Sequence, residues 1–167
     1  FGRHWPICRE GEQPPGAQTL VLLGQRSTCG LLDRLCREQG LELSADSPGS
    51  DGYVLFCATN ATRLVVAIGG SNARGVEYGQ DTFAQMLRSA GGKLSWVRGS
   101  IRDAPTVPWR GRPQTSVRDY LRPGELDLYV LSRINFIDLR GGIYAFEPGA
   151  QLDHQEIGQV VQAAHER

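Results

Sequence analysis

Two apolar segments separated by only four residues constrain the fold of this chain most strongly. Residues 53–58 read Y-V-L-F-C-A and residues 63–68 read R-L-V-V-A-I, with T-N-A-T between them. Short runs rich in β-branched and aromatic side chains favour strands, and a connection of this length suits a hairpin. The sequence therefore predicts an antiparallel pair of strands in the first part of the chain.

Further elements are predicted on both sides of this hairpin. They are a strand over 19–23, a helix that starts near Thr28 and ends at Gly40, a helix over 75–90, a strand over 94–97 and an exit segment over 101–105. This order predicts a two-layer α+β domain over residues 19–105, in which two helices cover one face of a mainly antiparallel sheet. Residues 1–18, rich in Pro, Gly and charge, are an irregular lead-in.

After Pro108 the pattern changes to strands alternating with helices. A strand is predicted over 110–120, a helix over 125–132, a strand over 135–139 and a helix that starts near Asp153. Such alternation is the signature of a parallel sheet. A complete (β/α)8 barrel takes about 250 residues, so residues 106–167 have room only for its first two β/α units. Because the chain also opens on Phe1, we expect it to be a piece of a longer protein.

Charge and hydropathy exclude two classes of partner. The chain carries 18 Lys and Arg against 18 Asp and Glu, so its formal net charge is zero. A nucleic acid or an anionic membrane surface selects a basic protein, and neither is expected as a partner. No apolar run approaches the roughly 20 residues that a membrane-spanning helix needs.

Side chains with metal-ligand spacing are absent from the sequence. Its three histidines form no H-E-x-x-H pattern, and its four cysteines form no C-x-x-C pattern, so neither a metal site nor a cofactor is predicted. Cys29 and Cys36 lie two turns apart on one predicted helix, too far for a disulfide, and we expect buried thiols. The loop 69–75 has neither the Gly-Lys-Ser/Thr ending of a P-loop nor the G-x-G-x-x-G spacing of a dinucleotide-binding loop. Its glycines are expected to provide positive φ and close packing.

A more specific signal is a series of motifs in a fixed order. D-G-Y-V-L (51–55) is followed by G-V-E-Y-G-Q-D-T-F-A-Q-M-L (75–87), I-R-D-A-P (101–105) and W-R-G (109–111). This series resembles the N-terminal domain of glycoside hydrolase family 20, the β-N-acetylhexosaminidases, leading into the catalytic barrel. The resemblance covers roughly residues 50–140.

The resemblance implies a glycan or glycoside substrate and a small set of binding residues. Arg118 falls where the family places an arginine that holds hydroxyls of the sugar, and a guanidinium has suitable donor geometry. Asp138 and Arg140 replace the two histidines of a second-strand motif and are candidates to reach a sugar. The catalytic Asp-Glu pair of the family lies on a later strand, so this chain is expected to contain no catalytic residue and to be inactive alone.

Two alternatives remain open on the sequence. Related accessory domains precede the barrels of family 84 and family 67 glycosidases, so the parent O-glycosyl hydrolase need not be a hexosaminidase. The chain is otherwise a non-catalytic carbohydrate-binding or interaction module, whose stacking faces come from four aromatic residues: Trp96, Trp109, Tyr120 and Tyr144.

Overall fold

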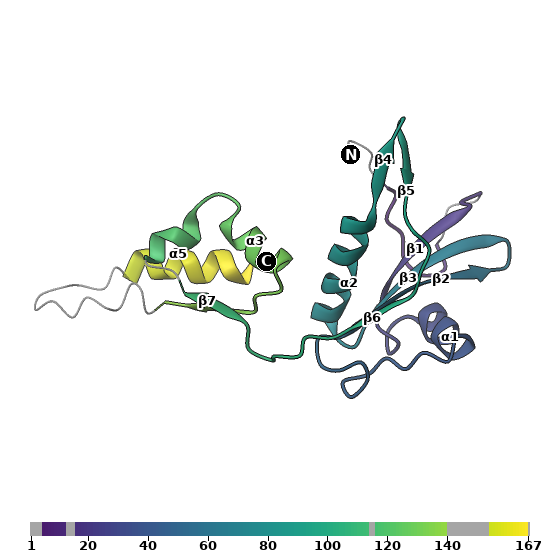
Figure 1. The fold of residues 1–167 in the computed structure, drawn as a ribbon, viewed down its shortest axis with the longest axis horizontal. Helices are drawn as coiled ribbons and strands as arrows, with labels where there is room; N and C mark the ends of the chain where they lie inside the picture. Colours follow the sequence, from purple (N-terminus) through teal and green to yellow (C-terminus); the bar gives the residue numbers. More distant parts are fainter. Residues whose placement is uncertain (1–4, 13–15, 114–115, 140–153, 167) are drawn as a thin grey trace, which may run out of the picture. The chain divides into compact units, whose positions relative to one another are not determined.

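The computed structural model describes residues 5–12, 16–113, 116–139 and 154–166 (Figure 1). The chain divides into two compact units, Phe1–Thr106 and Val107–Arg167, which are described separately. The elements of unit 1 are β1 (Thr19–Gly24), α1 (Gly30–Glu38), β2 (Tyr53–Asn60), β3 (Arg63–Gly70), α2 (Ala73–Met86), β4 (Arg88–Ala90), β5 (Lys93–Ser95) and β6 (Ile101–Asp103).

The predicted hairpin is the centre of unit 1. Strands β2 and β3 pair antiparallel along their whole length, from Tyr53 opposite Gly70 to Asn60 opposite Arg63. Strand β6 extends the sheet beside β2, and β1 lies beside β3, giving the order β1-β3-β2-β6. Because β1 runs parallel to β3, the sheet is mixed, and the prediction of a mainly antiparallel sheet holds only for the other two pairs.

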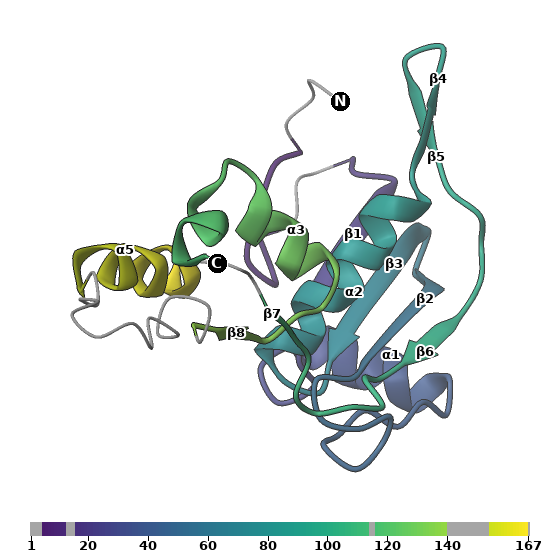
Figure 2. The same ribbon diagram turned by 60° about the vertical axis from the view of Figure 1, so that its left-hand side comes forward.

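The prediction of two layers is wrong, because the helices cover opposite faces of the sheet (Figure 2). Side chains alternate along a strand, and β2 and β3 are apolar at odd and even positions alike. Val54 and Phe56 pack with α1, whereas Leu55 and Ile68 pack with α2. Continuous apolar strands of this kind require cover on both sides, so unit 1 has three layers.

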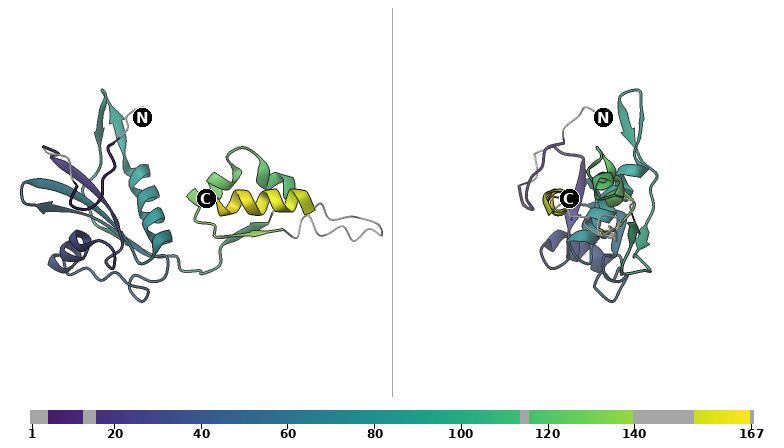
Figure 3. Two further views of the ribbon diagram at one scale, coloured as in Figure 1. Left: turned by 180° about the vertical axis from the view of Figure 1, so that it is seen from behind. Right: turned by 90° about the vertical axis from the view of Figure 1, so that its left-hand side faces the viewer.

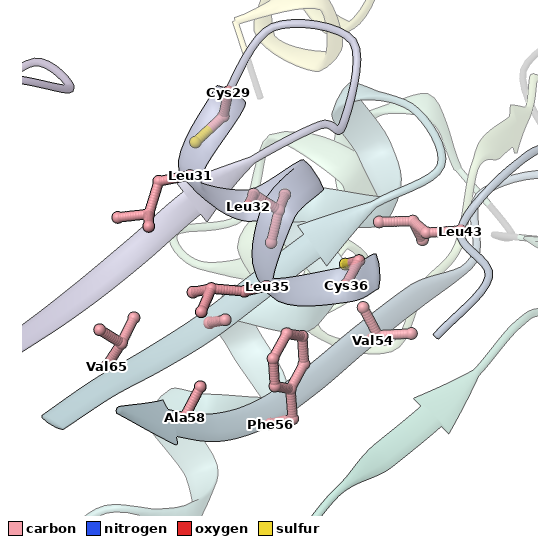
Figure 4. Packing of buried hydrophobic residues seen from close by; sticks show 11 residues of the cluster. Cys29, Leu31, Leu32, Leu35, Cys36, Leu43, Val54, Phe56, Ala58 and Val65 are labelled. Atoms are coloured by element: carbon pink, nitrogen blue, oxygen red, sulfur yellow. The ribbon is translucent and has the colours of Figure 1, made fainter. Parts of the chain in front are cut away.

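The core on the α1 side is a dense cluster beneath one amphipathic helix (Figure 4). Helix α1 buries Leu31, Leu32, Leu35 and Cys36 against the sheet. Leu32 and Cys36 are fully buried, and full burial of one leucine side chain contributes about 2 kcal/mol.

A glycine turn explains two errors in the segment after α2. The helix ends at Met86, and residues 88–90 form β4, which pairs with β5 in a separate two-stranded sheet. Gly91 and Gly92 both have positive φ, which is the geometry of a two-residue hairpin turn. They therefore turn a hairpin rather than end a helix. The segment 93–95 stays outside the main sheet, whose fourth strand is the predicted exit segment, Ile101–Asp103.

Unit 2 consists of a short parallel strand pair and packed helices. Its elements are β7 (Gly111–Pro113), the 3-10 helix η1 (Val117–Leu121), α3 (Glu125–Leu131), β8 (Phe136–Asp138) and α5 (His154–His165). Strands β7 and β8 pair in parallel, and Figure 3 shows α5 (yellow) beside η1 and α3 (green). The predicted strand over 110–120 ends at Pro113, because a capping box between Ser116 and Asp119 starts η1. The described residues form no barrel.

The thiols of α1 are buried and free. Cys29 and Cys36 are 7% and 0% exposed, so their predicted burial is confirmed, whereas Cys8 is exposed and Cys57 is half-buried. Burial raises the pKa of Cys29 above the ordinary 9.0, and the Glu10 carboxylate adds to the shift. Burial also raises the pKa of Cys36. Both side chains therefore stay protonated in mildly alkaline solution.

Thiol labelling tests this core directly. At about pH 8, we expect Cys8 to react rapidly with Ellman's reagent and Cys29 and Cys36 to react only after unfolding, because the thiolate is the nucleophile. Cys8→Ser removes the fast phase and leaves the slow phase unchanged. Native Cys36 reacting as fast as Cys8 contradicts this packing.

The unfolded chain loses these thiol protons at lower pH than the folded chain, so stability falls as the pH rises above 9.0.

Candidate functional site

The motif residues of unit 1 meet where α2 begins. Asn72 caps this helix, because its Oδ1 accepts a hydrogen bond from the backbone N–H of Gly75 at 2.9 Å. The amide of the same side chain donates to Asp51 Oδ1 at 2.9 Å. Asp51 is 9% exposed, has a positive φ of 57°, and also pairs with Arg74 at 3.4 Å. One carboxylate thus joins the loop before β2 to the first turn of α2.

A serine fixes the same two loops from the other side. Ser71 donates its backbone N–H to the carbonyl of Gly52 at 2.9 Å and its hydroxyl to the carbonyl of Gly49 at 2.8 Å. The hydroxyl also accepts from the N–H of Gly52 at 3.1 Å. Together with Asp51 and Asn72, these bonds form what we call the helix-sheet clamp.

The glycines of the clamp allow backbone to approach backbone. A Cβ at Gly75 would lie 2.2 Å from the carbonyl oxygen of Gly52, and one at Gly70 would lie 2.2 Å from the nitrogen of Val76. One turn later, a Cβ at Gly79 would lie 2.6 Å from Ile68 Cγ2. The expected close packing is therefore present, whereas the expected positive φ is absent at Gly70 and Gly75.

A second polar cluster ties α2 to the sheet through Tyr53, which is 1% exposed. Its hydroxyl lies 2.8 Å from Thr82 Oγ1 and 3.3 Å from Asp103 Oδ2. Thr82 donates to the carbonyl of Tyr78 at 2.9 Å. Strand β2, helix α2 and strand β6 are thus joined by partly buried hydrogen bonds, which rigidify a core when every group is satisfied.

The chemistry of these clusters is structural. Asp51, Asn72 and Tyr53 bond to other parts of the same chain, and none of these bonds prepares a nucleophile or an acid for a substrate. A phosphate at the N-terminus of α2 would meet the carboxylate of Asp51, whose charge repels it. The clamp therefore holds α2 on the sheet and is not an anion site.

The candidate sugar-binding residues lie in unit 2. Arg118 belongs to η1 and not to the end of a strand, its side chain is 76% exposed, and its Nε pairs with Glu156 of α5. Asp138 ends β8 and is half-buried; its backbone N–H donates to the hydroxyl of Tyr120 at 3.2 Å. That hydroxyl lies 2.8 Å from the Asp138 carbonyl oxygen. Arg140 lies outside the described residues.

The candidate stacking aromatics differ in environment. Tyr120 is 1% exposed and cannot present a face to a ligand, and Trp96 is half-buried against the ring of Phe83. Trp109 is 75% exposed and makes an edge contact with Phe136. Tyr144 lies outside the described residues.

Sequence reasoning missed two structural groups. The Glu10 carboxylate accepts from the N–H groups of Gly30 at 3.0 Å and Leu31 at 2.5 Å, so it caps α1 from 20 residues upstream. Capping signals are local, and nothing in the sequence points to this one. Arg110, in the W-R-G motif, donates to the carbonyls of Arg133 and Val107, each at 2.6 Å, so it links two loops of unit 2.

Other kinds of site find no support in the parts of the chain that the structure describes. There, no three His, Cys, Asp or Glu side chains come together where they could hold a metal ion. Likewise, no helix among these residues has the length and apolar character to cross a membrane.

The clamp predicts a large cost for one methyl group. Gly75→Ala places its Cβ against a backbone oxygen that cannot rotate away, and we expect a loss of about 3 kcal/mol in the free energy of unfolding. Gly99→Ala is the matched control in the same unit, because its Cβ meets no atom within 4 Å. Urea unfolding of both variants measures the difference, and equal stabilities would rule out the close approach.

Comparison with known proteins bears on the same part of the chain. A family model described as "Glycosyl hydrolase family 20, domain 2" matches residues 12–104, more than half of the 167 residues. The match includes the clamp, Tyr53 and all four strands of the main sheet. No curated protein matches.

Two solved structures are similar to this chain, and the first of them shares its fold. One described as "Structure of CpGH84B" is 20% identical with a TM-score of 0.52, covering 80% of this chain and 24% of that one. A Flavobacterium johnsoniae chitobiase, FjGH20, is 16% identical with a TM-score of 0.46, covering 90% of this chain and 30% of that one. The chain thus spans less than a third of either structure. The family model, which covers the sheet and both of its helices, shows that this chain belongs to glycosyl hydrolase family 20 through the family's domain 2.

Proposed function

We propose that this chain is the non-catalytic accessory domain of a glycoside hydrolase together with the first two β/α units of its catalytic barrel. The observation that carries the proposal is the helix-sheet clamp. Asp51, Asn72 and Gly75 stand in or beside the motifs that resemble the family, and all three hold α2 on the sheet. The part of the chain most typical of the family is therefore a scaffold.

The barrel part of the proposal rests on unit 2. Strands β7 and β8 are parallel, and α3 lies between them in the sequence, which is the arrangement of a β/α unit. Parallel sheets occur almost only with both faces covered, and two strands of three residues each are too few for independent stability. Further strands of the parent protein would complete the sheet.

Within this proposal, Arg118 remains the candidate residue for binding the hydroxyls of a sugar. Its guanidinium is exposed and presents several donors, although Glu156 now occupies it. The Glu156 side chain is only 23% exposed, but the Arg118 side chain is 76% exposed, so a sugar would reach the guanidinium from solvent. Asp138 and Arg140 complete the proposed set.

Catalysis by the parent enzyme requires groups that we place outside this chain. A glycosidase of this kind needs a carboxylic acid that protonates the leaving oxygen, beside a second group that stabilises the developing positive charge. The resemblance assigns this Asp-Glu pair to a later strand. The hexosaminidase specificity belongs to the proposal as well, with family 84 and family 67 enzymes as alternative parents.

An activity assay tests the proposal. We expect the purified chain to release no aglycone from an aryl N-acetyl-β-glucosaminide above the buffer blank. A complete β-N-acetylhexosaminidase, assayed in parallel, shows that the substrate and detection work. Circular dichroism on the same sample shows that the chain is folded. Turnover by the folded chain that scales with its concentration would overturn the proposal.

One observation favours a second candidate, a carbohydrate-binding module. Trp109 is 75% exposed, and an exposed indole is a suitable face for a sugar ring. The discriminating measurement is binding to an array of neutral glycans before and after Trp109→Ala, with Trp5→Ala, which removes another exposed indole, as control. Loss of neutral-glycan binding in the first variant alone would favour the module over the scaffold.

A further inference from the structure

The β4–β5 hairpin presents two cations on one face. It extends away from the main sheet of unit 1 in two different views (Figures 1 and 2). Arg88 pairs with Ser95 and Ala90 with Lys93. Directly opposed residues point to the same side of a strand pair, so these four side chains share a face. Arg88 and Lys93 are diagonal neighbours on it, and the Cα atoms of such neighbours are about 7–8 Å apart. The residues between the two cations are small.

The charge of this region differs from that of the chain as a whole. Between Asp81 and Asp103 there is no acidic residue, although the full sequence has equal numbers of acids and bases. The cations in this stretch are Arg88, Lys93, Arg98 and Arg102. The first three are exposed, and among the described residues none of them forms an ion pair. The hairpin is therefore a positively charged region on a protein whose formal net charge is zero.

The base of the hairpin is fixed to α2. The Trp96 ring packs edge-to-face on Phe83, with the ring centroids 5.9 Å apart. Arg88 Nη1 donates to the carbonyls of Gln85 at 2.8 Å and Leu87 at 3.2 Å, and the residue is exposed. A ligand thus meets one cation, Arg88, that is already held in place, and loses less binding free energy to ordering its side chain.

We propose that the β4–β5 hairpin binds an acidic polysaccharide, a glycan that carries carboxylate or sulfate groups. Arg88 and Lys93 supply charge-assisted hydrogen bonds to these anions, and the exposed Arg98, three residues beyond the end of β5, adds positive charge. The hydroxyl of Ser95 and the small face at Ala90 leave room for a sugar ring between the cations. The choice of a glycan over other polyanions rests on the proposed function, whereas the need for an anion rests on the charge alone.

Direct binding tests the proposal. The probes are heparin, which carries sulfates and carboxylates, and polygalacturonate, which carries carboxylates only; calorimetry at low salt measures binding of the full chain. We expect binding to at least one probe, weakened as salt is added. The triple variant Arg88→Ser, Lys93→Ser, Arg98→Ser is expected to weaken it about tenfold.

The matched control removes the same net charge elsewhere. Arg34, Arg37 and Arg122 are exposed but paired with Glu38, Asp33 and Asp119, and their triple serine variant is expected to keep the parent affinity within about twofold. If the triple variant loses its fold, the single variant Lys93→Gln, at an exposed position, tests the hairpin instead. We expect this variant to bind the polysaccharide about threefold more weakly.

Each remaining outcome contradicts the proposal. No binding to either probe at low salt overturns it, as does an equal loss in the control variant. Binding of poly-L-glutamate as tightly as either polysaccharide would assign the hairpin to acidic polypeptides instead. Hydrolysis of a glycoside does not enter this test, so turnover would overturn the proposed function while leaving the hairpin result unchanged.

Discussion

The rest of unit 1 depends on how closely helix α2 approaches the sheet. Gly75 lies so near the carbonyl oxygen of Gly52 that a single methyl group would overlap it. This approach places Asn72 where its side chain both caps the helix and reaches Asp51. The same bonds hold Asp51 at its positive φ, a region that aspartate adopts more readily than most residues with a side chain. The absence of a side chain at Gly75, the backbone conformation of Asp51 and the position of α2 on the sheet therefore depend on one another.

The sequence was sufficient wherever the signal was local. Strands β2 and β3 follow from two apolar runs, and α1 follows from a stripe of leucines. The two-layer prediction is wrong because β2 and β3 bury apolar side chains on both faces of the sheet, so each face needs its own helix. Gly91 and Gly92 end a helix or turn a hairpin with equal ease, and only the pairing of Ala90 with Lys93 decides between them. The capping of α1 by Glu10 is a long-range contact without a sequence signature.

The candidate site was predictable only in part, for a related reason. The motif 75–87 marks the family, but its glycines and its tyrosine act through packing, which a list of chemically reactive residues does not reveal. Arg118 was expected at a strand end, and a local capping box instead places it in η1, beside α5. Family membership therefore explains how this chain folds more directly than what it binds. The exposed side chains that could bind a ligand are the cations of the β4–β5 hairpin, which lies between the motifs, and the indole of Trp109, which begins the W-R-G motif.

Native-state hydrogen exchange tests the central claim, that the helix-sheet clamp is part of the global fold of unit 1. The N–H of Ser71 bonds to Gly52 and that of Gly75 bonds to Asn72, both in loop or first-turn positions that exchange by local opening in most proteins. The account predicts that both amides exchange with the same opening free energy as Val66 in the centre of β3. Exchange of Ser71 and Gly75 through a local opening, while Val66 remains protected, would contradict it.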